Sequence, residues 1–246
     1  TCPVYTLDAT LTPDYSAGDK YPDLSLTETA KLEFTNTSQE AWERVCLRDY
    51  AAANLALYDA QTDGASTAAS AIRAVRDGGG KALDLAVQDD PSVVYVTLPA
   101  PLAPGARTAL TVDFETPVPC CGERFGWFPV GNLEDGSRHT VCLSQAYPVL
   151  AEYRDGQWNE APYFQDGECF AAPCGSFEMT LRLPAGYTVI STGEEQDNGD
   201  GTWTLRADNV RDFAVIAGTA FEMLSAKTQG VTVRSFYAAG LPEDRR

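Results

Sequence analysis

Residues 177–183 read Phe-Glu-Met-Thr-Leu-Arg-Leu, and Pro184 follows them. An apolar side chain occupies every second position of this stretch, and Glu, Thr and Arg occupy the positions between. Because successive side chains of a β-strand point to opposite faces, this period of two places the apolar set against a core and the polar set in water. The stretch predicts a half-buried strand of an antiparallel sheet, ended by the proline.

The same alternation recurs outward from this stretch. It is found in segments 5–11, 31–35 and 110–114, whereas segment 92–98 is more continuously apolar and predicts a central strand. Turn-forming residues lie between the strand-like segments: Pro99, Pro101, Pro104-Gly105, Pro184-Ala185-Gly186 and the acidic run 197–201. Many short strands separated by such turns predict an all-β fold, either an antiparallel β-sandwich or a larger curved sheet.

The acidic run 197–201 predicts a hairpin that joins segment 187–191 to segment 202–207. Its aspartates also raise the question of a calcium site. An EF-hand loop needs alternating ligands and a glutamate at its twelfth position, and the spacing here gives neither. We interpret the run as a solvated turn.

At most one short helix is expected. Segment 67–76 is rich in alanine, Ile72 and Val75 lie three apart, and the glycines at 78–80 would end a helix there. A strand over 71–75 fits the same residues equally well. Since no internal repeat or linker interrupts the pattern, we expect one elongated domain over residues 1–246.

The chain of 246 residues carries 35 acidic and 18 basic side chains, a net charge of −17. A surface this negative repels phosphate backbones and anionic lipid headgroups, so we expect no nucleic-acid partner and no electrostatic docking to a membrane. A membrane-spanning helix needs about 20 consecutive apolar residues. No stretch approaches that length, and no transmembrane segment is expected.

The single histidine, His139, limits the metal and catalytic chemistry of the chain. A zinc site with two histidines cannot be built, and the metallopeptidase motif H-E-x-x-H is absent. His139 stands among turn residues with no acid or base beside it, so we expect it at the surface. We expect no zinc and no other cofactor in this chain.

Seven cysteines are spaced without a C-x-x-C pair, which favours disulfides in an oxidising compartment over a metal cluster. At least one disulfide is expected among five of them, with the pairing left open: Cys120, Cys121, Cys142, Cys169 and Cys174. The chain begins Thr1-Cys2, which fits removal of a signal peptide. Cys2 is then either a lipid-anchor cysteine or half of a disulfide, and we expect an extracytoplasmic protein.

Aromatic residues concentrate between positions 125 and 170: Trp127, Tyr147, Tyr153, Trp158, Tyr163 and Phe164. They could stack on sugar rings or peptide side chains, or they could pack the core and anchor loops. In the same region Asp166 and Glu168 lie two apart, which would place them on one side of a strand. Glycoside hydrolysis needs a pair of carboxylates, but nothing else in the sequence supports that reaction.

A series of short motifs follows in order along the chain. They read YTLDATL at 5–11, LEFTN at 32–36, PLAPG at 101–105, VDFE at 112–115, VP at 118–119, RFG at 124–126, YPVLAEY at 147–153, GQW at 156–158, PY at 162–163, GECF at 167–170, FEMTL at 177–181, GY at 186–187, STG at 191–193 and NVRDFA at 209–214. In this order they resemble the N-terminal β domain of the alanyl aminopeptidase-like zinc metallopeptidases, which include the leukotriene hydrolases. The bacterial extracytoplasmic variety is the most similar.

The resemblance implies a large saddle-like antiparallel β domain packed beside a thermolysin-like catalytic domain. That catalytic domain carries H-E-x-x-H, a further glutamate ligand and a Gly-x-Met-Glu-Asn segment, none of which is in this sequence. The chain is therefore expected to be a domain truncated before its catalytic neighbour, inactive by itself, with zinc held by the missing part. The implied partners are that catalytic domain and the N-terminus of a peptide substrate. The implied location is outside the bacterial cytoplasm, secreted or lipid-anchored at the cell surface.

The resemblance also implies one substrate-binding residue, Gln145. In the family a glutamine of a Thr-Gln pair binds the free amino group of the substrate, and Ser144-Gln145 is the matching place. An amide oxygen can accept a hydrogen bond from an ammonium group, so we expect Gln145 at the edge of an exposed apolar patch. A surface glutamine without this role is the alternative. For the whole chain, the alternative is a stand-alone extracellular β-sandwich module that binds glycans or a protein partner.

Overall fold

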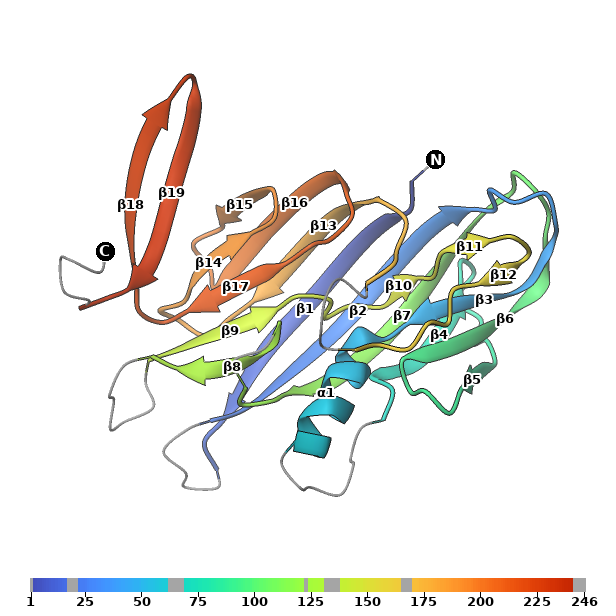
Figure 1. Ribbon diagram of the computed structural model, residues 1–246, viewed down its shortest axis with the longest axis horizontal. Coiled ribbons are helices and arrows are strands. Elements are labelled where there is room, and N and C mark those ends of the chain that lie inside the picture. The colour runs from blue at the N-terminus through green and yellow to red at the C-terminus, as the bar shows by residue number, and fades with distance from the viewer. Residues whose placement is uncertain are drawn as a thin grey trace.

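The computed structural model describes residues 2–16, 22–61, 69–121, 124–130, 138–164 and 170–240. About 59% of the chain is strand and 5% is helix, which confirms the all-β fold with a single short helix in the described part. Figure 1 shows a long, twisted sheet with smaller sheets around it. No helix in the described part of the chain is long and apolar enough to cross a membrane.

A seven-stranded sheet forms the main layer. In spatial order its strands are β15 (Glu194–Asp197), β16 (Thr202–Val210), β13 (Gly175–Arg182), β1 (Val4–Asp14), β2 (Asp23–Thr35), β7 (Arg107–Val118) and β4 (Ile72–Asp77). Phe177, Met179 and Leu181 of β13 are buried, as the alternation predicts, and the residues between them face water.

One strand pair of this largely antiparallel sheet is parallel. Strand β1 pairs in parallel with β13, from Val4 opposite Ser176 to Thr10 opposite Arg182. The other strand pairs that the structure describes are antiparallel. Strands β1 and β13 lie far apart in the sequence, so no hairpin turn, which would make them antiparallel, links them.

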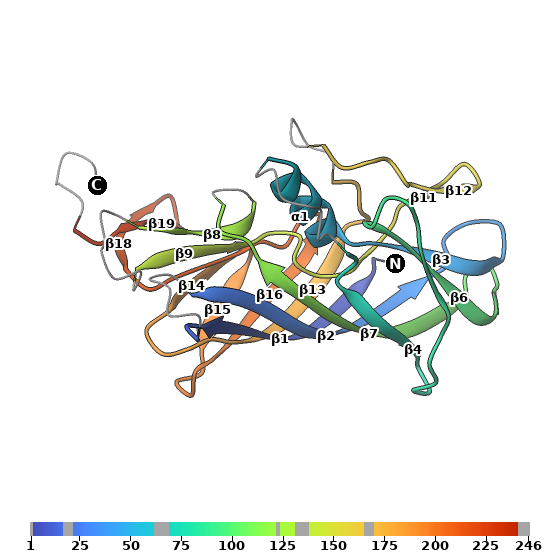
Figure 2. The same cartoon turned by 90° about the horizontal axis from the view of Figure 1, so that it is seen from below.

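The smaller sheets pack on one face of the main sheet (Figure 2). One has the order β10 (Val149–Leu150), β3 (Trp42–Arg48), β6 (Val93–Leu102) and β5 (Leu85–Val87). Another has the order β14 (Thr188–Ser191), β17 (Val215–Gly218), β9 (His139–Leu143) and β8 (Phe125–Pro129). Two hairpins stand apart: β11 (Tyr153–Arg154) with β12 (Gln157–Trp158), and β18 (Phe221–Thr228) with β19 (Val231–Ala238).

One cluster of buried apolar side chains, drawn from residues between Tyr5 and Ala217, joins the main sheet to the smaller sheets. The predicted central strand is confirmed, because β6 lies between β3 and β5. No residue of the β18–β19 hairpin belongs to this buried cluster.

The one helix of the described part lies before the segment in which a helix was expected. Helix α1 covers Tyr50–Gln61. In the segment 67–76, for which a helix or a strand was expected, residues 72–76 belong to β4, which confirms the strand alternative. Residues 67 and 68 lie outside the described part. Asp49 begins α1, since its carboxylate accepts a hydrogen bond from the backbone N–H of Ala52 at 3.1 Å.

The turn at 197–201 is present, but it joins β15 to β16, so the predicted pairing of segment 187–191 with segment 202–207 is wrong. Segment 188–191 forms β14 and pairs with β17 instead. Gly193 separates β14 from β15. It has φ of +94°, and a Cβ atom there would lie 2.1 Å from the carbonyl oxygen of Arg206, so the chain can change sheets only at a glycine.

Candidate functional site

Gln145 is buried rather than exposed, which corrects the expectation drawn from the resemblance. Its residue is 3% exposed, and its Nε2 donates a hydrogen bond to Oδ1 of Asp212 at 2.5 Å. It also has a φ of +59°, a left-handed conformation that is uncommon for a residue with a side chain. The amide is engaged inside the molecule, between the strands β9 and β10.

The burial of Gln145 has a physical reason in the neighbouring segment 212–213. The hydroxyl of Tyr147 accepts a hydrogen bond from the backbone N–H of Phe213 at 3.0 Å, next to the Asp212 carboxylate that holds Gln145. Burial, with Asp212 as the next cause, raises the pKa of Tyr147 well above its ordinary value. These contacts join residues 67 positions apart, and no local sequence pattern announces them.

His139 is also buried, so the expectation of a surface histidine is wrong. It is 1% exposed, its Nε2 forms a hydrogen bond with the hydroxyl of Tyr187, and the ring of Trp127 lies 5.8 Å away in an edge-on arrangement. His139 is the first residue of β9, and that strand is buried on both faces at its start. The turn residues before it gave no sign of this.

The cysteines that the structure describes carry thiols, and no disulfide joins them. Cys121 and Cys142 are nevertheless neighbours. The sulfur of Cys121 lies 2.5 Å from the position that a Cβ atom of Gly126 would occupy, and Gly126 is directly opposite Cys142 in the β8–β9 pair. Cys120 and Cys174 are exposed, and Cys169 lies outside the described residues. The predicted disulfide stays a prediction, now with one pair favoured.

The aspartates of the acidic turn accept hydrogen bonds from backbone N–H groups of the same turn. Oδ1 of Asp197 accepts from the N–H of Gly199 at 2.8 Å, and Oδ1 of Asp200 accepts from the N–H of Thr202 at 3.0 Å. Both aspartates are exposed, which confirms a solvated turn. Within the described part of the chain, no group of three or more histidine, cysteine or acidic side chains is arranged to hold a metal ion. Asp166 and Glu168 lie outside that part.

The aromatic region divides into two sets. Trp127 and Tyr147 are core residues, whereas Tyr153, Trp158 and Tyr163 are partly exposed and Phe164 is 54% exposed. Tyr153 and Trp158 are paired across the β11–β12 hairpin, and their ring centroids lie 4.9 Å apart. The ring of Trp42, from β3, lies 4.7 Å from that of Trp158.

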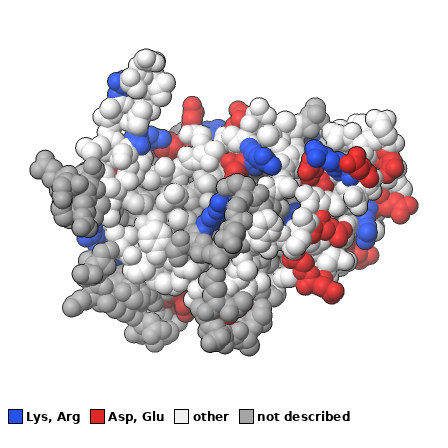
Figure 3. Space-filling model, viewed as in Figure 1, with Lys and Arg blue, Asp and Glu red and all other residues white. Residues whose placement is uncertain are grey.

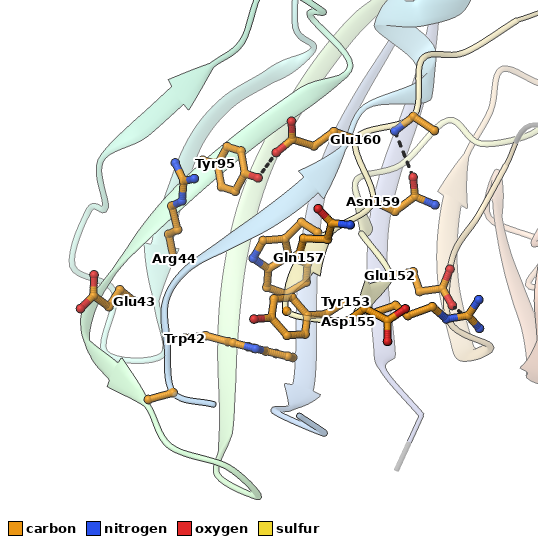
Figure 4. Close-up of a pocket in the computed structure, with 15 residues that line it drawn as sticks. Trp42, Glu43, Arg44, Tyr95, Glu152, Tyr153, Asp155, Gln157, Asn159 and Glu160 are labelled. Carbon is orange, nitrogen blue, oxygen red and sulfur yellow. Dashed lines mark hydrogen bonds and ion pairs between the residues drawn. The ribbon is translucent and has the colours of Figure 1, made fainter. Parts of the chain in front are cut away.

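These three rings form one side of a cleft of about 810 Å³ between β3 and the β11–β12 hairpin. The opposite side contains Arg44 and Tyr95, with the Arg44 guanidinium carbon 3.8 Å from the centre of the Tyr95 ring. Figure 4 shows Glu160 pointing toward Tyr95, whose hydroxyl donates a hydrogen bond to that carboxylate. Burial and this hydrogen bond raise the pKa of Tyr95, so the hydroxyl stays protonated.

A buried arginine holds segment 159–161, which lines the cleft. Arg48 is 1% exposed, and its guanidinium donates to the carbonyl oxygens of Asn159 at 3.0 Å and Ala161 at 2.9 Å and to Oγ of Ser92 at 3.1 Å. It therefore ties segment 159–161, which follows the hairpin, to β3. The hairpin aromatics were expected from the sequence. Trp42, Arg44 and Tyr95 were not, because they lie on β3 and β6, far away in the sequence.

No protein-family model and no curated protein matches this chain.

Proposed function

We propose that this chain is a non-catalytic β domain of a secreted or surface-anchored zinc aminopeptidase-like protein. It would form one wall of the peptide cleft and support a separate catalytic domain, which would hold the zinc. Two things support the proposal: the ordered series of motifs that resembles this family, and the state of the β18–β19 hairpin. The hairpin is the structural observation that carries it.

One face of the hairpin is apolar and uncovered. The register places Leu224 opposite Ser235, Ala226 opposite Val233 and Thr228 opposite Val231, so their side chains share a face. Leu224, Val231 and Val233 are 52%, 60% and 52% exposed. In Figure 3 the hairpin stands out from the body with few charged atoms on it.

Only part of the other face of the hairpin contacts the rest of the molecule. Arg234 forms an ion pair with Glu195 of β15, and the rings of Phe221 and Phe236 lie 6.5 Å apart near the base. A two-stranded hairpin is marginally stable in water unless its apolar side packs on something. The free face, with Leu224 and Val233, is therefore suited to a neighbouring domain, whose contacts typically bury about 600–1,500 Å².

Gln145 does not support the proposal. The resemblance assigns it a contact with the substrate ammonium, but its amide is held by Asp212 in the interior. The proposed function rests on the domain arrangement and leaves that contact unassigned.

The coding sequence downstream of Arg246 tests the proposal most directly. We expect H-E-x-x-H within the next domain, typically about 100–150 residues long. A stop codon there, or a following domain without this motif, would contradict the proposal and leave the stand-alone binding module.

A variant tests the role of the hairpin in the full-length protein. Leu224→Asp together with Val233→Asp places two charges on the free face, and we expect increased protease cleavage between the domains and reduced peptidase activity. Val87→Asp is the matched control, because Val87 is 49% exposed on β5 of another sheet. Wild-type activity and cleavage in the double variant would show that this face is not the interface.

A further inference from the structure

We propose that the cleft between β3 and the β11–β12 hairpin binds a neutral saccharide. This site goes beyond the proposed function, since it would exist whether or not a catalytic domain follows. Its volume of about 810 Å³ falls within the range of about 300–1,000 Å³ that small-molecule sites occupy.

The aromatic side of the cleft offers a surface on which a sugar ring can stack. Tyr153 and Trp158 are partly exposed, and the 4% exposed Trp42 supports them from below. The carbon–hydrogen face of a pyranose ring is apolar and fits against such rings, as other apolar groups do. The hairpin holds the two exposed rings in place, because Tyr153 pairs with Trp158 and the Tyr153 hydroxyl donates to Glu40 at 2.8 Å.

The Trp42 indole is a buried support for the two exposed rings. Its ring lies 5.2 Å from that of Tyr153 and 4.7 Å from that of Trp158. Its N–H has almost no accessible surface and no hydrogen-bond partner among the described residues, so Trp42 shapes this side of the cleft through packing.

The polar side of the cleft can both donate and accept hydrogen bonds. The Arg44 guanidinium donates, the Glu160 carboxylate accepts, and the exposed Gln157 amide does both. Sugar hydroxyls also do both, so this mixed set suits them. Figure 4 shows Arg44 beside the Tyr95 ring, with Tyr153 and Trp42 lower in the same view.

The charges that line the cleft argue against an anionic ligand, and Arg44 occupies the Tyr95 face on which a cation would stack. Four carboxylates and two guanidinium groups line it: Glu43, Glu152, Asp155, Glu160, Arg44 and Arg154. The excess of carboxylates opposes an anion such as a phosphate or a uronic acid. A cation would meet Arg44, which already occupies the face of Tyr95, and Arg154, which pairs with Glu152 at 3.3 Å. A neutral, hydroxylated ligand avoids both penalties.

Isothermal titration of the intact chain with four neutral hexasaccharides tests the site: cellohexaose, xylohexaose, maltohexaose and N-acetylchitohexaose. We expect saturable binding of at least one of them. Trp158→Ala should weaken that binding by at least about tenfold, as loss of a stacking ring does. Gln157→Ala, at an exposed position that the fold does not need, should weaken it several-fold. Trp203→Ala, on β16 of the main sheet, is the matched control and should bind like the wild type.

Three results would overturn the proposal. The first is that none of the four saccharides binds. The second is that a saccharide binds but neither Trp158→Ala nor Gln157→Ala weakens it. The third is that polygalacturonate or an arginine-rich peptide binds at this cleft in preference to the neutral saccharides.

Discussion

A carboxyl group without a partner lies inside the main sheet at Glu28. The residue is 4% exposed, it faces the core between Ala9 and Phe114 of the neighbouring strands, and both carboxyl oxygens lack a hydrogen bond within the described residues. Burial, and next the negative charge of Asp8, raise the pKa of Glu28 well above its ordinary value. Ionising a buried carboxyl group without hydrogen-bond partners has a high free-energy cost, so the folded protein favours the protonated form.

This raised pKa makes stability depend on pH. Below about pH 4.5, the ordinary pKa of glutamate, the group is protonated in both the folded and the unfolded chain. As pH rises further, the unfolded chain releases this proton and the folded chain does not, so the free energy of unfolding falls by up to about 1.4 kcal/mol per pH unit until the folded pKa is reached. Glu28→Gln should therefore gain stability relative to the wild type as pH rises from 4.5 to 8.

Urea denaturation across that pH range measures the effect. Glu194→Gln is the control, because Glu194 is an exposed residue of β15, and its difference from the wild type should change little with pH. Equal pH dependence of the Glu28→Gln variant and the wild type would show that Glu28 is not held protonated.

Asp49 is also buried, but unlike Glu28 it has hydrogen-bond partners on both carboxylate oxygens. Its Oδ2 accepts from the Ser70 hydroxyl at 2.8 Å and from the N–H of Ala71 at 2.5 Å, while Oδ1 caps α1 through Ala52. Asp49→Ala should lower the free energy of unfolding by about 2–4 kcal/mol, because it removes a helix cap and leaves buried donors unpaired. Ser70→Ala removes one of these bonds and should cost less. Urea unfolding that places both variants within error of the wild type would contradict this role.

At the scale of elements, the β8–β9 pair brings Cys121 and Cys142 together over Gly126. We predict that oxidised glutathione links them through a disulfide. The two protein thiols are oxidised, and one glutathione disulfide takes up their two electrons and two protons to give two glutathione thiols. The link closes a loop of about 20 residues and should add about 3 kcal/mol to the free energy of unfolding.

Mass spectrometry of the alkylated, non-reduced protein identifies the pair. Cys142→Ser should abolish the link, and Cys174→Ser, at an exposed position in another part of the chain, should leave it in place. Finding both Cys121 and Cys142 alkylated after oxidation would refute the pairing.

Strands were predictable from the sequence because the period-two pattern is local. The alternation at 177–183 gave β13, and the continuous apolar run at 92–98 gave the central strand β6. Strand partners were not predictable in the same way. Strands β14 and β15 join different sheets because the chain bends at Gly193, which lies close to the backbone of Arg206. This contact between distant residues cannot be predicted from the local sequence. The helix was misplaced because α1 is set by Asp49 and its bonds to residues about 20 positions away.

At the scale of the whole molecule, the same limit applies to the candidate sites. His139 was expected at the surface because turn residues precede it, and Gln145 because of the role that the resemblance implies. Both are buried, where they form hydrogen bonds with Tyr187 and Asp212. The saccharide cleft was visible only as an aromatic hairpin. Its other side comes from β3 and β6, whose residues lie more than 50 positions earlier in the chain.

On the face that Figure 3 shows, the described acidic side chains are unevenly distributed. In Figure 3 the acidic side chains gather on the side where β3, β6 and the β11–β12 hairpin lie, and few appear on the side of β8, β9 and the β18–β19 hairpin. The acidic end thus repels negatively charged surfaces, whereas the other end carries the apolar face suited to a protein neighbour.

The parallel pairing of β1 with β13 has a consequence for the order of events during synthesis. Strand β1 leaves the ribosome before both of its partners and can pair with β2 as soon as β2 follows, since the two are consecutive in the sequence. Its other edge needs β13, which begins at Gly175, so that edge stays open until strands β2 to β12 have also been made. Contacts so distant in sequence form slowly, and an open strand edge can pair with other chains in the meantime. Strand β1 is thus made before its sheet partners, yet its second edge is paired late.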